Sequence, residues 1–433
     1  MKIQHHLEKI SWALLDKMLF IGFGIVNLLQ ISIMETIEFG LFTLFIQLNS
    51  YIFILSDSFA LQNIIHFGAV ESNRGKVNLT ALLIHTAIVM SISFLIYLSG
   101  DLLSAIFYSN RFTEVTAALP LLSFLMIFRS FVGKILVRDH LWKKIFFTDL
   151  FFFGTMSLVI LYYKFNSLTM DFATASKIYY IGTFLGSLIT ILISLKQIEL
   201  NFKGNIKVRD MINFSIPFTL TAALTYIPKY LDVFIIQFSF RSTEIVGVYQ
   251  AAKNLFRVFD EGINAANGLI YPAAVRNFEK KDYKALYDIV TKSVSFMLIT
   301  YLGMIIILEL GFSRLMIEWF LPSSYQNTIP QFNIMLIAAI FLPFTVLFYI
   351  ALSSGNYWKL FRIAVISTLF SIFGFLLAGF LGNELLAPLG LIVYNLVNGL
   401  LLVLYVKNEI GLPIKFSDLF RAISDSLNFL KKK

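Results

Sequence analysis

Long apolar stretches alternate with short polar connections along almost the whole chain. Twelve such stretches lie near residues 12–34, 39–65, 78–99, 115–133, 145–163, 178–195, 213–238, 245–270, 288–310, 330–352, 361–382 and 385–406. Each is too long for an ordinary buried strand, whereas a helix that crosses a bilayer takes about 20 apolar residues. The pattern therefore predicts an all-α integral membrane protein with twelve transmembrane helices.

The composition supports this prediction and excludes several classes of protein. Of 433 residues, 58% are apolar and 14% are charged, whereas a soluble domain carries about 25% charged residues. A soluble enzyme and a disordered scaffold are therefore excluded. The chain has no cysteine, which excludes disulfides and thiolate metal sites. We predict no cofactor, with a transmembrane H⁺ or Na⁺ gradient left open as the energy source.

The basic residues follow the connections between the apolar stretches. If the N-terminus is cytoplasmic, 24 of the 35 Lys and Arg residues fall in inside segments and only 5 in outside segments. This is the positive-inside distribution of a multi-pass protein. It accounts for the net charge of +9 without nucleic acid as a partner. It predicts that both termini are cytoplasmic. The longest outside connection, about 311–329, contains Trp319 and Phe320, which indicate a short helix at the interface.

The two halves of the chain resemble each other. IEFGLF at 37–42 and EIVGVY at 244–249 place Gly40 and Gly247 207 residues apart, each near the start of a helix. Trp142-Lys143 and Trp358-Lys359 form a second pair, 216 residues apart. We predict a six-helix N-terminal lobe over 1–195, a cytoplasmic linker over 196–210, a six-helix C-terminal lobe over 211–406 and a basic cytoplasmic tail over 407–433. Two repeats of equal topology predict a V-shaped cleft between the lobes.

The eighth stretch carries polar residues at spacings of three and four, which place them on one helical face. These are Gln250, Lys253, Asn254, Arg257, Asp260, Glu261, Asn264 and Asn267, opposite Leu255, Phe256, Val258, Phe259 and Ile263. A charge at the membrane centre costs roughly 2.5–3.5 kcal/mol, so buried charges need a reason. One interpretation is the wall of a cavity. The alternative is a self-neutralised set, with Lys253, Arg257 and Glu261 four residues apart.

Other polar residues lie in or at the ends of the apolar stretches. Pro228 predicts a kink in the seventh stretch, where Lys229 and Asp232 either form a structural pair or place a titrating carboxylate beside a hinge. Lys17 and Arg129 either snorkel to the inside interface or line the same cavity. The basic groups outnumber the acidic ones in these stretches, which favours an anionic ligand such as a diphosphate. His85 predicts packing or an interhelical hydrogen bond, and Gly182 with Gly186 predicts close helix packing.

With these features, the chain resembles polysaccharide flippases of the multidrug/oligosaccharidyl-lipid/polysaccharide exporter superfamily, and most of all O-antigen translocases of the Wzx type. The resemblance rests on SWALLDK at 11–17, on IEFGLF at 37–42 and on FSIPFTL, LDVFII, EIVGVYQAAKNL and YPAAVRNFEKKD within 214–282. The two Trp-Lys turns and FLPSSYQNTIPQFNIM at 320–335 add to it.

The resemblance implies a fold like that of multidrug and toxin extrusion (MATE) transporters and alternating access. It implies transfer of an undecaprenyl-diphosphate-linked oligosaccharide from the cytoplasmic to the periplasmic leaflet of the bacterial inner membrane. Membrane lipids, a polysaccharide polymerase and chain-length proteins are the other expected partners.

A cationic cavity would hold the diphosphate and sugar, with Lys253 and Arg257 at the best-matching positions. The candidate substrate-binding residues are Lys253, Arg257, Lys229, Asn254, Gln250, Lys17 and Arg129, and the candidates for ion coupling are Asp232, Asp260 and Glu261.

Two other functions fit fewer of these features. A drug or cation antiporter of the same superfamily would have a net acidic cavity, which the excess of Lys and Arg opposes. An O-antigen polymerase or a glycosyltransferase would need a large periplasmic loop or an acidic motif outside the membrane. The outside connections are too short for such a domain, so we predict that the protein is not an enzyme.

Overall fold

The computed structural model describes residues 3–412, and within this range it is built of helices with no strand. The α-helices are α1 (Ile3–Ile31), α2 (Thr36–Ser56), α3 (Gln62–His66), α4 (Arg74–Leu98), α5 (Gly100–Ile106), α6 (Phe112–Arg138), α7 (Trp142–Phe165), α8 (Phe172–Ser194), α9 (Val208–Tyr226), α10 (Asp232–Phe240), α11 (Thr243–Glu279), α12 (Tyr283–Ile307), α13 (Ser313–Phe320), α14 (Thr328–Phe341), α15 (Leu347–Ser353), α16 (Tyr357–Phe380) and α17 (Leu389–Tyr405).

Short turns of tighter or wider helix join or interrupt these helices. The 3₁₀ turns are η2 (Glu71–Asn73), η3 (Leu195–Gln197), η6 (Ser323–Tyr325), η7 (Leu342–Val346) and η8 (Glu384–Leu386). The π turns are η1 (Asp57–Leu61), η4 (Ile227–Leu231), η5 (Leu308–Phe312) and η9 (Val406–Ile410). Two of the π turns, η1 and η4, interrupt long apolar helices.

Eleven helical segments of the described residues are long and apolar enough to cross a membrane, so the chain is a multi-pass membrane protein. The polar stripe keeps α11 outside that set, although it is a continuous helix of 37 residues over the eighth predicted stretch. The total of twelve spans therefore stays a prediction. The helix predicted around Trp319 is present as α13, and Trp319 is exposed.

The chain forms two compact units. The first runs to Tyr226 and includes Arg241–Gly247 and Phe320–Ser324. The second comprises Ile227–Phe240, Val248–Trp319 and the chain from Tyr325 on. The predicted lobes, linker, tail and V-shaped cleft stay predictions, and the tail from residue 413 on lies outside the described residues.

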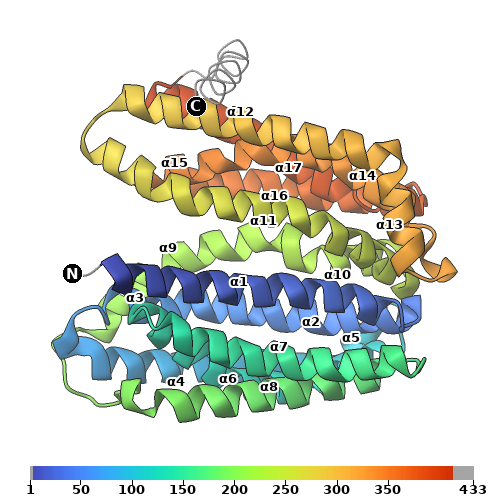
Figure 1. Ribbon diagram of the computed structural model, residues 1–433, viewed down its shortest axis with the longest axis horizontal. Helices are drawn as coiled ribbons and strands as arrows, with labels where there is room; N and C mark the ends of the chain where they lie inside the picture. Colours follow the sequence, from blue (N-terminus) through green and yellow to red (C-terminus); the bar gives the residue numbers. More distant parts are fainter. Residues whose placement is uncertain (1–2, 413–433) are drawn as a thin grey trace. The chain divides into compact units, whose positions relative to one another are not determined.

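In the first unit, α1 packs against α7, α7 against α8, and α8 and α4 against α6 (Figure 1, blue to green). The predicted close packing at Gly182 and Gly186 is confirmed against α7. A Cβ atom at Gly182 would lie 2.5 Å from Cγ of Met156, and one at Gly186 would lie 2.9 Å from Cβ of Phe152. Glycine is needed at both positions because the two backbones approach so closely.

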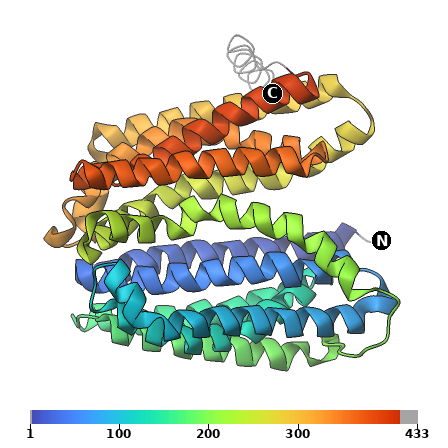
Figure 2. The ribbon, with the colours of Figure 1, turned by 180° about the vertical axis from the view of Figure 1, so that it is seen from behind.

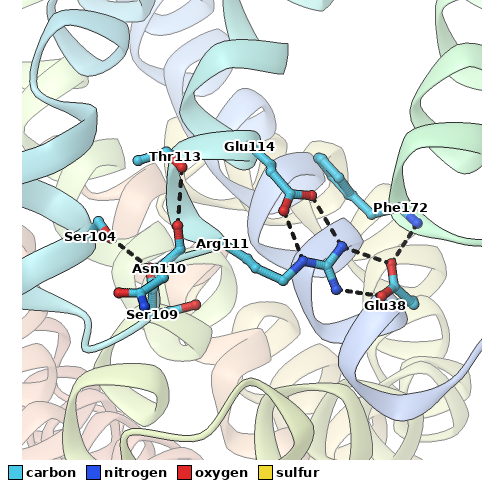
Figure 3. A network of polar contacts seen from close by, with 8 residues as sticks. All are labelled: Glu38, Ser104, Ser109, Asn110, Arg111, Thr113, Glu114 and Phe172. Atoms are coloured by element: carbon cyan, nitrogen blue, oxygen red, sulfur yellow. Dashed lines mark hydrogen bonds and ion pairs between the residues drawn. The ribbon is translucent and has the colours of Figure 1, made fainter.

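A cluster of ionic contacts joins three helix starts in the first unit (Figure 3). Arg111 forms ion pairs with Glu38 of α2 and with Glu114 of α6, the latter at 2.8 Å. The backbone N–H of Phe172, at the start of α8, donates to Glu38 at 2.8 Å. Hydrogen bonds from the two carboxylates raise the pKa of Arg111 well above its usual range. The cluster therefore holds α2, α6 and α8 in register at the end predicted to be periplasmic.

The second unit has its closest helix contacts between α16 and α17, which lie side by side (Figure 2). Gly390 of α17 lies against Phe375 of α16, where a Cβ atom would be 2.2 Å from the Phe375 ring. The hydroxyl of Ser371 donates to the backbone oxygen of Gly390 at 2.9 Å. Helices α10 and α14 also pack on this pair, on α16 and α17 respectively.

The two glycines of the predicted repeat contact each other's helix. Helix α2 begins at Thr36 and α11 begins at Thr243, and each glycine lies one turn further on. A Cβ atom at Gly40 would lie 2.0 Å from the backbone oxygen of Thr243, and one at Gly247 would lie 2.1 Å from that of Thr36. The repeated sequence therefore marks a reciprocal helix contact within the first unit, which includes residues 241–247.

Candidate functional site

The predicted apolar face of helix α11 is largely buried, and the predicted polar face is only partly exposed, because Gln250 and Asn267 are buried. Leu255, Phe256, Phe259 and Ile263 are buried, whereas Arg257, Glu261 and Asn264 are exposed. Val258 is the exception to the predicted apolar face, because its side chain is exposed. The Nε atom of Arg257 lies 3.4 Å from Oε1 of Glu261, and these side chains are 45% and 47% exposed. The pair one turn apart that the sequence predicts is thus present at the surface of the helix.

The predicted break at Pro228 is also present. Helix α9 ends at Tyr226, the π turn η4 covers Ile227–Leu231, and α10 continues from Asp232. Proline has no N–H and cannot continue the hydrogen-bond ladder, which locally widens the helix. The ammonium group of Lys253 on α11 donates to the backbone oxygen of Lys229 at 2.7 Å. A side chain from the neighbouring helix therefore satisfies a carbonyl group of this turn.

Asp232 is the buried centre of this region, with an exposed fraction of 0%. Its Oδ2 atom accepts hydrogen bonds from Nζ of Lys253 and from the hydroxyl of Tyr249, each at 2.6 Å. The sequence spacing had allowed Lys229 as its ion-pair partner. That pairing is wrong: the described structure pairs Asp232 with Lys253, and the side chain of Lys229 is exposed.

A buried ion pair of this kind constrains both helices. Removing one partner leaves an uncompensated charge, which costs about 3–5 kcal/mol. The charge of Lys253 is compensated by the buried Asp232. The exposed cations of the candidate site are Lys229 and Arg257, and Arg257 pairs with Glu261 at the surface. The chemistry available to a ligand is therefore anion binding at an exposed face beside a buried, neutralised pair.

The remaining predicted residues of this group lie on the same helix. The Nε2 atom of Gln250 donates to Oδ1 of Asn254 at 2.8 Å, one turn along α11. Asp260 lies on the same helix, three residues beyond Arg257. All of these residues belong to the second unit.

Lys17 and Arg129 belong to the first unit instead. Arg129 of α6 forms an ion pair with Asp149 of α7, and its guanidinium carbon lies 3.9 Å from the centre of the Phe152 ring. The ammonium of Lys17 lies 6.0 Å from the ring centre of Phe20. The contacts shown for these two cations therefore lie within the first unit.

Sequence reasoning missed two partners of the predicted residues. Asp149 has a signal in the sequence, because it is an acidic residue inside the apolar stretch over 145–163. Tyr249 has no such signal, since tyrosine is common in apolar helices and its hydroxyl contact depends on how α10 and α11 pack. Among the described residues, no group of three or more His, Asp or Glu side chains is placed to hold a metal ion.

Comparison with known families gives one match. A family described as "Polysaccharide biosynthesis protein" matches residues 7–278. No curated protein sequence matches the chain.

Solved transporter structures share the fold. An inward-facing multidrug resistance MATE family transporter of the MOP superfamily, the superfamily named above, aligns with a TM-score of 0.77 and 12% identity, over 90% of this chain and 94% of its own. The lipid II flippase MurJ, in an inward closed conformation, aligns with a TM-score of 0.75 and 14% identity, over 97% of this chain and 91% of the flippase chain. A MOP superfamily transporter from Pyrococcus furiosus aligns with a TM-score of 0.58 and 14% identity, over 93% of this chain and 92% of the transporter chain. At this identity the likeness establishes the fold and leaves the substrate open.

Proposed function

Because the chain belongs to the polysaccharide biosynthesis protein family, we propose that it is a flippase for a lipid-linked oligosaccharide. Its substrate is an undecaprenyl-diphosphate-linked O-antigen or related surface polysaccharide unit. The protein moves this lipid from the cytoplasmic to the periplasmic leaflet of a bacterial inner membrane by alternating access. It is a transporter and forms no covalent bond with the substrate. A polysaccharide polymerase and chain-length proteins would receive the product.

The observation that carries the proposal is two exposed cations, Arg257 of α11 and Lys229 of the π turn η4. A diphosphate has strong acceptor oxygens, which arginine and lysine bind by charge-assisted hydrogen bonds. Arg257 and Lys229 are exposed, and Lys253 contacts the backbone oxygen of Lys229. Gln250, which is buried, donates to Asn254 on the same helix. Charged residues in membrane-spanning helices mark substrate pathways. In this proposal Arg257 and Lys229 contact the diphosphate, while Lys253 holds the break in the preceding helix in place.

The carboxylates of the same unit are candidates for coupling transport to an ion gradient. Asp232 has one oxygen engaged by Lys253 and Tyr249, whereas Oδ1 has no hydrogen-bond partner among the described residues. Asp260 and Glu261 lie on α11 next to the cationic residues. In this proposal H⁺ or Na⁺ acts on these carboxylates and drives the cycle.

The experiment that tests the substrate class uses the full chain in proteoliposomes. One set contains fluorescent undecaprenyl-diphosphate-linked oligosaccharide, and a matched set receives a cationic dye with an imposed ion gradient. The proposal predicts protein-dependent transfer of the lipid between leaflets, measured by accessibility to an impermeant quencher, and no transport of the dye. Dye transport without lipid transfer would instead identify a drug or cation antiporter.

A further inference from the structure

The first unit contains a cavity that the candidate site on α11 does not use. Its volume is about 310 Å³, at the lower end of the range of roughly 300–1,000 Å³ for ligand pockets. Residues of α2, of the turn η1, of α6 and of α9 line it. All of these residues belong to the first unit, and none was singled out from the sequence.

The π turn η1 gives the cavity a fixed edge. A π turn leaves backbone carbonyls without their usual partners, and such turns are frequent at functional sites. Here the hydroxyl of Ser58 donates to the backbone oxygen of Ile54 at 2.5 Å. The amide of Asn63 donates to the backbone oxygens of Phe59 at 3.0 Å and of Ala60 at 3.2 Å. The turn is therefore held by its own side chains before any ligand binds.

His85 holds one polar group of the cavity lining in place. Its ring nitrogens form hydrogen bonds with the hydroxyls of Ser56 at 2.6 Å and of Ser130 at 2.8 Å, and the histidine is buried. This confirms the interhelical hydrogen bond predicted for His85. Ser130 lines the cavity, so the histidine fixes one of its polar groups.

The polar part of the cavity lining includes Asp57 and Gln62, and the charge of Asp57 is balanced by Lys134. Asp57 Oδ1 lies 2.9 Å from Nζ of Lys134, and Nε2 of Gln62 donates to Asp57 Oδ2 at 2.9 Å. A carboxylate offers about four acceptor positions and an amide oxygen offers two. Asp57 and Gln62 can therefore still accept hydrogen bonds from hydroxyl groups of a ligand. Because Lys134 neutralises Asp57, this part of the lining has no net positive charge with which to bind a diphosphate.

The rest of the lining is apolar and includes three aromatic rings beside Ile54, Met126 and Ala222. Phe218, Ala222 and Tyr226 follow each other at intervals of four residues, so they share one face of α9 and turn it toward the cavity. Phe53 of α2 adds a further ring. Flat rings beside a few fixed acceptors match a sugar ring, which has C–H groups on its faces and hydroxyls on its edge.

We propose that this cavity binds one uncharged sugar ring of the transported oligosaccharide, with Asp57 and Gln62 accepting from its hydroxyls and Phe218 and Tyr226 packing on its face. This inference rests on the proposed function and adds a sugar subsite to it. The cavity thereby contributes to the choice of the sugar. Discontinuous helices such as α2–η1–α3 and α9–η4–α10 commonly form substrate sites in transporters.

The test compares two probes on the full chain in detergent: undecaprenyl-diphosphate N-acetylglucosamine and undecaprenyl diphosphate. The variants are Gln62→Leu and Phe218→Leu. Phe184→Leu is the matched control, since Phe184 is 52% exposed, Phe218 is 47% exposed, and Phe184 lines a separate, wholly apolar cavity. We expect wild type and the control to bind the sugar-bearing lipid more tightly. We expect Gln62→Leu and Phe218→Leu to lose about tenfold in that affinity only.

Each outcome has one meaning. Unchanged affinity of the variants for undecaprenyl diphosphate shows that they are folded and confines the loss to the sugar. Equal affinities of the wild type for the two probes, or variants that retain the wild-type preference, would overturn the sugar subsite and leave the flippase proposal intact. Failure of the wild type to bind either lipid would overturn the proposed function itself.

Discussion

Lys253 and Arg257 lie one turn apart on α11, yet the structure gives them different chemistry. The ammonium of Lys253 contacts Asp232 and the backbone oxygen of Lys229, both at the break in the preceding helix. Arg257 is exposed and pairs with Glu261 of its own helix. We therefore separate a structural cation from a ligand-binding cation, although both are candidates by sequence alone.

This separation predicts a difference in stability. Lys253→Ala leaves the carboxylate of Asp232 buried without its ion partner, at a cost of about 3–5 kcal/mol. Arg257→Ala removes an exposed pair one turn apart, which is worth about 0.3–0.5 kcal/mol. Thermal unfolding of the purified variants in detergent measures both effects. We expect a midpoint lowered by several degrees for Lys253→Ala and one close to wild type for Arg257→Ala.

The double variant Asp232→Asn/Lys253→Met is the control for this effect. It removes both charges, so it should recover much of the stability that Lys253→Ala loses. If Lys253→Ala unfolds at the wild-type temperature, the ion pair does not hold α10 and α11 together.

Neutralising a coupling carboxylate should change how transport depends on the ion gradient. Asp260→Asn keeps the size of the side chain on α11 and removes its charge. Transport by reconstituted vesicles is then measured at several imposed H⁺ and Na⁺ gradients. We expect the dependence to be weaker in Asp260→Asn or in Asp232→Asn than in the wild type. The same dependence in both variants as in the wild type would exclude the coupling role.

At the residue scale, local spacing allowed Lys229 as a partner for Asp232, and the structure pairs Asp232 with Lys253 instead. Lys229 is three residues away along the chain, whereas the actual partner, Lys253, comes from the next helix, 21 residues further on. The helical period places side chains on a face but carries no information on the register between two neighbouring helices. The Arg257–Glu261 pair was predictable because both side chains lie on one helix.

At the scale of helices, two long apolar segments are broken by π turns. The break at η4 was predictable from Pro228, whose missing N–H interrupts the ladder. The break at η1 contains no proline or glycine, and its sequence DSFAL reads as ordinary helix. The side chains of Ser58 and Asn63 take up its freed carbonyls, so it is stabilised by local hydrogen bonds that periodicity does not reveal. The sugar cavity was missed for the same reason.

The close contact between α2 and α11 predicts that a side chain larger than glycine at position 40 destabilises the protein. Gly40→Ala would place a methyl group 2.0 Å from the backbone oxygen of Thr243, which cannot move without shifting α11. Gly133→Ala in α6 is the matched control, because a Cβ atom there meets nothing within 4 Å. Alanine is preferred to glycine inside a helix by about 1 kcal/mol.

We therefore expect Gly40→Ala to lower the thermal midpoint and Gly133→Ala to leave it unchanged or raise it. Both are measured in the same detergent as the wild type. A Gly40→Ala midpoint equal to that of Gly133→Ala would contradict the close approach of the two helices.

At the scale of the whole molecule, the all-helical membrane fold was predictable from the apolar stretches and the loop charges. Helix α11, which covers the eighth predicted stretch, leaves the number of spans open. Its polar face makes it too hydrophilic to qualify as a spanning helix, although its length of 37 residues is sufficient. The polar residues of α11, on which the proposed function rests, are thus the reason that the number of spans is not settled.

Reporter fusions test the topology. A fusion after residue 205 should report the cytoplasm and a fusion after residue 325 the periplasm, because the basic residues concentrate in the segments predicted to be inside. Enzymatic activity of a reporter that functions in only one compartment gives the result. Both fusions on the same side would reject the twelve-span topology.

The proposed function depends most directly on Arg257 as a ligand for the diphosphate. The decisive measurement is the rate at which undecaprenyl-diphosphate-linked oligosaccharide crosses between leaflets in proteoliposomes containing wild type, Arg257→Lys or Arg257→Ala at equal protein content. We expect the rate to fall to background in Arg257→Ala and to be partly retained in Arg257→Lys, which keeps the charge but loses the forked geometry. Wild-type transfer by Arg257→Ala would contradict the assignment of the α11 face as the diphosphate site.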